Sequence, residues 1–391
     1  MTGSQIIILS IIVFSYVIVA IMLYVGISSI KDRVDKRKLM DIEKGFGDLI
    51  KAQINQLNKG VELNKNYINV VEKSLECPMH FKVFCAICAD NHGNNPEVIS
   101  KYVNIFEDRI VKLFLKMDSK NIMKYAYYVF LIGEFRINKV IINKTMLENL
   151  NSDSVYIRVN SLKALSKIGD MNSFIDALRI ISLRGRYFNE KVIIDAIDSF
   201  EGDSEELDRR LVEEMGNFTD DMINMVITHF SNRGYRGCER ALINKISDGR
   251  TSKEVTIRLI RYFDVVYTKG SERYLYDLIE SPYWEVRAAA AKTLSKYNFE
   301  PIKYKLKSLT GDFNYHVRYN AAMTLIKKGK NDSAVQEIIN GEDKYARDIM
   351  IYSMFHNNLI NYEEYKAFTK DGIGDINGPV YEPLKKKEAQ V

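Results

Sequence analysis

The first apolar pattern in this chain is an unbroken stretch at its N-terminal end. Residues Ile6 to Ile27 form a run of 22 residues without a charge. As an α-helix, this run spans about 33 Å at ~1.5 Å per residue, which is enough to cross a hydrocarbon core of ~30 Å. The residues that interrupt its aliphatic character are Ser10, Ser15, Tyr16, Tyr24 and Gly26. The sequence therefore predicts a transmembrane helix at 6–27 that crosses a membrane once.

The charges beside this helix predict its orientation. Residues 1–5 contain no Lys or Arg, whereas Lys31, Arg33 and Lys36 to Lys38 follow the apolar run. The positive-inside rule then places 1–5 outside the cell and the rest in the cytoplasm. A cleaved signal peptide would need a basic N-terminal region, a shorter apolar run and a small-residue cleavage site. We therefore expect an uncleaved, single-pass protein of the cell membrane.

A helical pattern of apolar positions follows the transmembrane segment. Residues 28–75 have this pattern, with breaks at Gly45 and Gly47, and we interpret them as a juxtamembrane stalk or cap. Residues 371–391 contain Gly, Pro and charged residues without periodicity, which predicts a loose C-terminal tail. The segment 76–370 between them is predicted to be a helical repeat domain.

The repeat is most evident in three copies, which contain Ile157-Arg158, Val286-Arg287 and Val317-Arg318. In each copy a small residue follows the Arg by three positions and a large apolar residue follows it by seven. Taking the Arg position as an index, the copies are centred on Met123, Arg158, Ile193, Ile223, Thr256, Arg287, Arg318 and Arg347, which are 29 to 35 residues apart. This period is typical of stacked helical repeats. The small residue allows neighbouring helices to approach closely.

The copies resemble the HEAT-repeat family of armadillo-like helical solenoids over about residues 120–360. The acidic residue that commonly precedes the Val-Arg pair in that family is matched by Asp153, Glu190, Asp220, Glu254, Glu285 and Asp343. The copies at Met123, Ile193, Ile223, Thr256 and Ala346-Arg347 depart from the Val-Arg pair. The resemblance implies an all-α fold, a right-handed α-solenoid of helix pairs. It also implies that the recurrent arginines pair with turn carboxylates, although a basic ladder for an anionic partner is the alternative.

A cluster of Cys and His residues at 77–92 is the one candidate metal site. Cys85, Cys88 and His92 have helical spacings of three and four, so a Zn²⁺ ion could bind on one helix face. However, only five positions separate His80 from Cys85, which leaves no loop between two ligand pairs. We favour buried thiols, with no metal and no cofactor. Four Cys in the whole chain are also too few for a disulfide framework.

Aromatic residues recur in the turns before the repeat helices. Tyr283, Trp284, Phe313 and Tyr315 would line one edge of a stack and could bind a protein, with Trp284 as the hot spot. The alternative is a hydrophobic staple, in which each ring packs on its own helix, and we favour it for most of these rings; at Trp284 both interpretations stay open. Tyr16 lies near the middle of the membrane, where a hydroxyl favours contact with another membrane protein.

Charge and motifs argue against an enzyme. The net charge of +5 arises from 56 basic and 51 acidic residues, so binding of a nucleic acid is not expected. We find no Walker loop, no paired-His metalloprotease helix and no Gly-flanked nucleophilic Ser. Two alternatives remain, since HEAT-like folds include DNA glycosylases: a nucleic-acid enzyme, and a regulator that binds a small ligand in the concavity of the solenoid.

The favoured hypothesis is a non-enzymatic, membrane-anchored scaffold. It would contact membrane lipid and position a membrane protein or a membrane-associated protein at the cytoplasmic face. The abundance of Ile, Lys, Asn and Tyr is typical of an AT-rich bacterial genome. Bacterial single-pass HEAT-like proteins look like accessory subunits of envelope machinery, so the resemblance points to a complex such as a surface-polysaccharide synthase.

Overall fold

The computed structural model describes residues 3–93, 95–184, 188–247, 251–268, 270–297, 301–327 and 332–370. Every regular element in these ranges is a helix, which confirms the predicted all-α class for the described part of the chain. The chain forms two compact units, unit 1 at Met1–Leu207 and unit 2 at Asp208–Val391. The predicted tail at 371–391 and the first two residues lie outside the described ranges.

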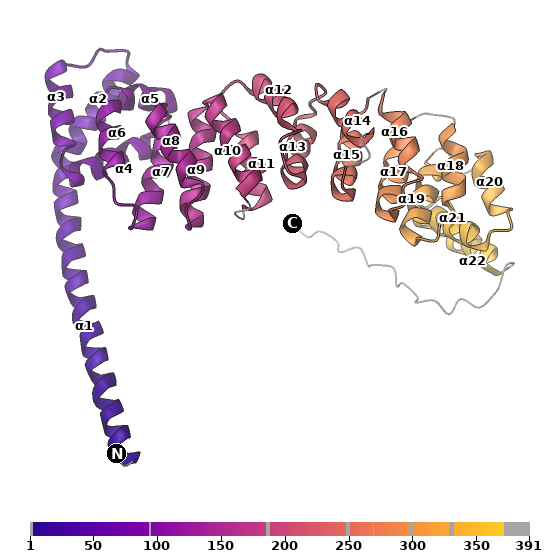
Figure 1. Cartoon of the computed structure of the whole chain (residues 1–391), viewed down its shortest axis with the longest axis horizontal. Helices are drawn as coiled ribbons and strands as arrows, with labels where there is room; N and C mark the ends of the chain where they lie inside the picture. The colour runs from indigo at the N-terminus through magenta and orange to yellow at the C-terminus, as the bar shows by residue number, and fades with distance from the viewer. Residues whose placement is uncertain are drawn as a thin grey trace. The chain divides into compact units, whose positions relative to one another are not determined.

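Helix α1, Gly3–Ile42, carries the apolar run (Figure 1). Among the described residues it belongs to the one helix that is long and apolar enough to cross a membrane. The helical path does not stop at Gly45 and Gly47, because both lie in a π-helical turn, η1, Glu43–Gly47, that leads directly into α2, Asp48–Asn58. A Cβ on Gly47 would lie 3.0 Å from Ile87 Cδ1, so a side chain there would crowd helix α4.

The remaining helices of unit 1 are α3 Lys65–Ser74, α4 Pro78–His92, α5 Pro96–Asn104, α6 Glu107–Leu115, α7 Ile122–Glu134, α8 Val140–Asn149, α9 Val155–Ile168, α10 Met171–Arg184 and α11 Glu190–Asp198. Helix α12, Ser204–Glu214, runs across the boundary between the units. In unit 1, α1 packs on α4, α4 on α7, α7 on α9, and α9 on α11.

Unit 2 contains α13 Asp220–Arg233, α14 Glu239–Ser247, α15 Lys253–Val265, α16 Ser271–Leu278, α17 Trp284–Thr293, the short 3-10 helix η2 Leu294–Lys296, α18 Pro301–Leu309, α19 Tyr315–Ile326, α20 Ser333–Ile339, α21 Lys344–His356 and α22 Tyr362–Lys370. In this unit the repeat helices pack in series: α13 on α15, α15 on α17, α17 on α19, and α19 on α21.

The repeat index marks a fixed position in these helices. It is the fourth residue of α9, α11, α13, α15, α17, α19 and α21. Four positions before it, the side chains of Asn189, Ser252, Asn314 and Asp343 accept hydrogen bonds from backbone N–H groups of the first turn. These N-caps satisfy N–H groups that have no partner within the helix, and they fix where these four helices begin.

The register predicted for the first copy is wrong. Ile122 and Met123 are 45% and 66% exposed, whereas Tyr125 and Tyr128 are buried. The N-cap of α7 is Asn121, so the fourth residue of this helix is Tyr125. The copy therefore begins two residues later than predicted, because the cap sets the register and the apolar pattern around Met123 does not.

Close approach and hydrogen bonds join successive repeat helices. A Cβ on Gly133 of α7 would lie 2.6 Å from Ala164 Cα of α9, so this contact requires glycine. Asn160 Nδ2 donates to the Ala126 carbonyl at 2.9 Å, and Thr324 Oγ1 donates to the Ala291 carbonyl at 2.7 Å. The helices of one unit are thus fixed to their neighbours by polar contacts as well as by their apolar faces.

Candidate protein-binding surface

The recurrent arginines are bonded to the turns that precede the repeat helices. Arg287 donates from Nε and Nη2 to the carboxylate of Asp312 at 2.8 and 3.0 Å, and from Nη1 to the Ser281 carbonyl at 2.9 Å. Arg158 Nη1 donates to the Ser152 carbonyl at 2.8 Å, and Arg318 Nη1 to the Asp312 carbonyl at 2.8 Å. These three guanidinium groups tie turns to helices; Arg287 does so through a turn carboxylate, as the resemblance implies, and Arg158 and Arg318 through turn carbonyls.

Aromatic rings of the turns lie over the same guanidinium groups. The Arg287 guanidinium is 5.9 Å from the centre of the Phe313 ring. The Arg318 guanidinium is 6.0 Å from the centre of the Tyr315 ring and 5.6 Å from that of Tyr345. Because a cation within about 6 Å attracts the face of a ring, each bonded arginine helps to hold an aromatic side chain in place.

Most of these rings are exposed. We call Tyr283, Trp284, Phe313, Tyr315 and Tyr345 the turn aromatics; their exposed fractions are 53%, 39%, 93%, 46% and 71%. A staple buries its ring against the helix it precedes. Phe313 therefore does not act as a staple, and Trp284 has surface available for a partner while still touching its own unit.

A second line of rings extends from the turn aromatics along the helices. Trp284 stacks on His316 with ring centres 5.4 Å apart. Tyr315 stacks on Tyr319 at 6.1 Å, and Tyr319 contacts Tyr352 at 6.3 Å. The sequence pattern did not single out His316, Tyr319 and Tyr352, although the tyrosines are 33 residues apart, which is one repeat period.

Paired charges flank the aromatic rings. Lys253 Nζ lies 2.9 Å from Glu285 Oε1 and 5.9 Å from the centre of the Tyr283 ring. The hydrogen bond from Lys253 lowers the pKa of Glu285, and the same bond raises the pKa of Lys253. Exposed rings bordered by charged groups are typical of protein-binding surfaces. The arrangement therefore combines exposed apolar area with charged groups at its border.

The Cys and His residues predicted as a candidate metal site lie on α4 or at its N-terminal end. Cys85 and Cys88 are buried in α4, and burial raises the pKa of both thiols. His92 Nδ1 lies 3.7 Å from Glu134 Oε2 on α7. Within the described ranges, no group of three or more His, Cys, Asp or Glu side chains could hold a metal ion.

Unit 2 also contains a buried ionisable pair that the sequence did not reveal. His229 Nε2 lies 2.8 Å from Asp208 Oδ1, and both side chains are almost fully enclosed. Arg233 Nη1 is 3.3 Å from the second oxygen of Asp208. His229 and Arg233 are one helical turn apart on α13, but Asp208 is 21 residues from His229 in the sequence, and no motif links them. The pair joins α12 to α13 inside unit 2.

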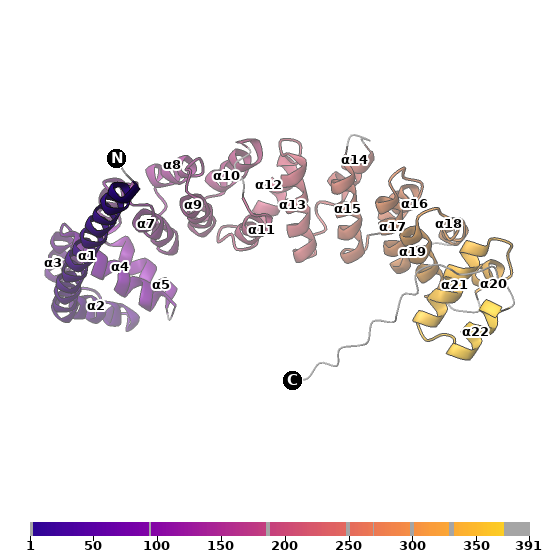
Figure 2. The same cartoon turned by 90° about the horizontal axis from the view of Figure 1, so that it is seen from below.

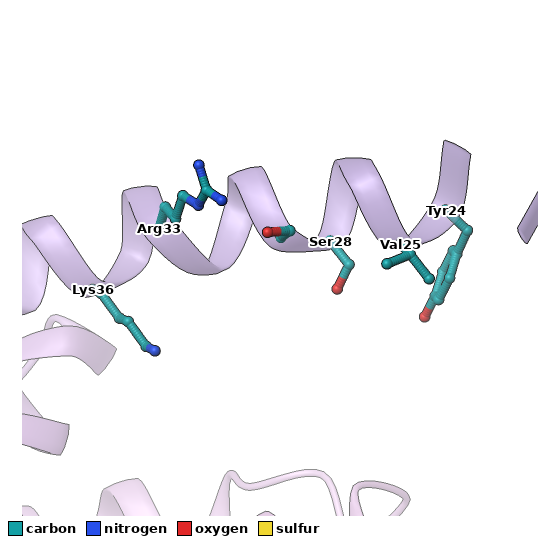
Figure 3. Close-up of a pocket in the computed structure, with 6 residues that line it drawn as sticks. Tyr24, Val25, Ser28, Arg33 and Lys36 are labelled. Carbon is teal, nitrogen blue, oxygen red and sulfur yellow. The ribbon is translucent and has the colours of Figure 1, made fainter. Parts of the chain in front are cut away.

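Helix α1 has a shallow hollow on its flank, of about 370 Å³. Its lining residues all belong to α1: Tyr24, Val25, Ser28, Ser29, Arg33 and Lys36. Figure 3 shows that Ser28 and Lys36 point to the side on which other segments lie, while Arg33 points away. Tyr16 of the same helix is 75% exposed. The hollow marks the change from the apolar to the basic part of α1.

Comparison with known proteins adds no relative. No family model matches the chain, and no curated protein matches it significantly in sequence. The features described above define a helical protein whose N-terminal helix is long and apolar enough to span a membrane.

Proposed function

We propose that this chain is a membrane-anchored scaffold built as a right-handed, HEAT-like α-solenoid. Two observations support the solenoid: the fixed register of the index residue, and the packing of each repeat helix on the next within its unit. The stacking of helix pairs gives such a protein a long surface for partners and no catalytic pocket.

We place residues 6–27 across the cell membrane, with the N-terminus outside and both units in the cytoplasm. The basic residues that follow the apolar run support this orientation. A membrane-impermeant maleimide added to intact cells should then label a Ser4→Cys variant and leave Cys77 unlabelled, although Cys77 is exposed on the folded protein. Labelling of Cys77 in intact cells would show the opposite orientation.

The scaffold binds a membrane protein or a membrane-associated protein through the turn aromatics, and this proposal involves no cofactor. The observation that carries it is Phe313, which is 93% exposed although it is held near the Arg287 guanidinium. Burying a Phe side chain contributes about 1.5–3 kcal/mol, so this ring offers binding energy that folding does not use. An envelope complex, such as one that synthesises a surface polysaccharide, is the partner to test first.

Site-specific photo-crosslinking of the full chain in its native membrane tests this proposal. A benzophenone side chain at Phe313 should give a defined crosslinked protein. The same side chain at Tyr304 is the matched control, because Tyr304 is 80% exposed on α18 but is not a turn aromatic. The double substitution Phe313→Ser and Tyr345→Ser should remove the partner during purification.

Identical crosslinks from positions 313 and 304 would argue against the turn aromatics as the binding surface. Absence of a crosslink at 313, together with binding of DNA that weakens steeply as salt is raised, would favour the nucleic-acid alternative.

A further inference from the structure

Unit 1 has a second exposed apolar surface, at the edge where α7 and α9 begin. Near the start of the two helices, Asn160 of α9 donates a hydrogen bond to the Ala126 carbonyl of α7. Nearer their ends, Ala164 of α9 lies against Gly133 of α7. The two helices therefore run in the same direction. Their first turns therefore lie side by side. We call this surface the α7–α9 edge.

The residues of the α7–α9 edge combine apolar side chains with lysines. Ile122, Met123, Val155 and Tyr156 are 45%, 66%, 55% and 63% exposed. Lys120 and Lys124 are exposed beside them. Asp118 lies in the same loop, where its carboxylate accepts a hydrogen bond from the backbone N–H of Lys120. The four apolar residues precede the index positions of their helices, Tyr125 and Arg158, and so lie outside the buried face of the repeat.

This edge lies on the side of unit 1 from which α1 projects. Figure 1 shows the loops that lead into α7 and α9 on that side, and α4 links α1 to α7 by packing on both. Figure 2 shows the same helices from below. The packing of α1 on α4, and of α4 on α7, holds these elements in one unit. The hollow on α1, with Ser28 and Lys36 on the side of the other segments, is found where the apolar run ends (Figure 3).

We propose that the α7–α9 edge rests on the bilayer surface beside α1. Ile122, Met123 and Tyr156 enter the interfacial layer, and Lys120 and Lys124 bind the phosphates of anionic lipid headgroups. Apolar and tyrosine side chains partition to this layer, and lysines near an anionic surface are attracted to it. A lipid surface is the occupant because the edge continues the side of the molecule that α1 anchors. The inference rests on the proposed membrane span and is independent of the partner that binds the turn aromatics.

Depth-dependent quenching on the full-length chain tests this proposal. The chain carries Cys77→Ser and one added Cys with an environment-sensitive fluorophore, in nanodiscs of phosphatidylcholine with about one-third phosphatidylglycerol. The quencher is a lipid whose nitroxide lies near the headgroup. The test position is Met123→Cys. The matched control is Val140→Cys, which is 87% exposed at the start of α8, after the far end of α7. A third variant, Val19→Cys in the apolar run, is labelled separately and tests the membrane span itself.

We expect quenching at position 123 to be at least about twice that at position 140, with emission shifted to shorter wavelength. Lys120→Glu with Lys124→Glu should abolish this difference in the anionic nanodiscs, and circular dichroism should show an unchanged helix content. Equal quenching at 123 and 140 while position 19 is strongly shielded from water would overturn the inference and leave the anchor intact. An unshielded position 19 would overturn the membrane span and, with it, this inference.

Discussion

At the scale of single residues, the cysteines show how burial controls chemistry. Cys77 is exposed, whereas Cys85, Cys88 and Cys238 are buried. Burial raises the pKa of Cys238 to about 11 from an ordinary value of 9.0. The thiolate is the reactive form, so the three enclosed thiols are inert near neutral pH.

Alkylation measures this difference directly. At pH 8, iodoacetamide should add one group to the native protein, at Cys77, and four after unfolding in urea, as read by mass spectrometry. Between pH 9 and 11 the unfolded chain loses the Cys238 proton before the folded chain does, so stability falls through this range. The stability deficit of Cys238→Ala should therefore shrink as pH rises from 9 to 11. Modification of a second native thiol at pH 8 would contradict the burial.

Arg287 is the residue whose loss should cost most at the turns. Its side chain and that of Asp312 are 11% and 8% exposed, so Arg287→Met leaves a largely buried carboxylate unpaired. We expect a loss of about 2–4 kcal/mol in urea unfolding, with partial recovery when Asp312→Leu is added. Arg261→Met, at an exposed position on α15, is the matched control and should change stability by no more than ~0.5 kcal/mol. Equal losses from both substitutions would refute the role of the pair.

Residue types alone could predict that Arg287 pairs with a carboxylate, but not that the aromatic rings of the turns are exposed. The resemblance implied that a recurrent Arg pairs with a turn carboxylate, and Arg287 does so with Asp312, whereas Arg158 and Arg318 donate to turn carbonyls. Exposure of Phe313 depends on how far the turn projects from its unit, and no local pattern encodes that distance. The burial of Cys85 and Cys88 followed from their apolar neighbours in α4.

At the scale of the helices, Gly133 allows α7 and α9 to approach closely. Gly133→Ala should destabilise the protein by about 1–3 kcal/mol, because the added methyl group would meet the backbone of Ala164. The substitution would otherwise favour a helix by up to ~1 kcal/mol. Gly45→Ala is the control, since its Cβ has no atom within 4 Å. A Gly133→Ala variant as stable as the control would show that α7 and α9 can separate without cost.

The index residue has the expected position both in helices with a bonded N-cap side chain, such as α11 and α19, and in helices without one, such as α9 and α17. The repeat pattern itself, and not the cap, therefore made these positions predictable. The error at Met123 arose because exposed apolar residues precede the buried face of α7. The π-helical turn at Glu43–Gly47 was not predictable either, since two glycines in a helical pattern are compatible with a break or with a continuous helix.

At the scale of the whole molecule, the division into two units has no marker in the sequence. The boundary between Leu207 and Asp208 falls inside α12, in a segment without Gly or Pro. Linker composition therefore gives no sign of it. The division follows from packing, because repeat helices contact mainly their neighbours in the chain.

Equilibrium unfolding should reveal the two units. Trp284 is the single Trp and reports on unit 2, whereas far-ultraviolet circular dichroism reports on all helices. We expect the two signals to give different midpoints in urea, because a stack held by neighbour contacts need not unfold in one step. Trp284→Phe with Tyr127→Trp moves the probe to unit 1 and should shift the fluorescence midpoint. If the fluorescence and circular-dichroism curves superimpose in both the original chain and the double variant, the two units unfold as one cooperative unit.

The uninterrupted path from α1 through η1 into α2 has a mechanical consequence. A membrane-spanning helix tilts until its apolar length matches the thickness of the bilayer. Because α1 packs on α4 and meets no flexible joint before η1, a change in tilt would rotate unit 1 by the same angle. In the proposed membrane-anchored arrangement, the lipid composition of the membrane would then set the angle between unit 1 and the bilayer.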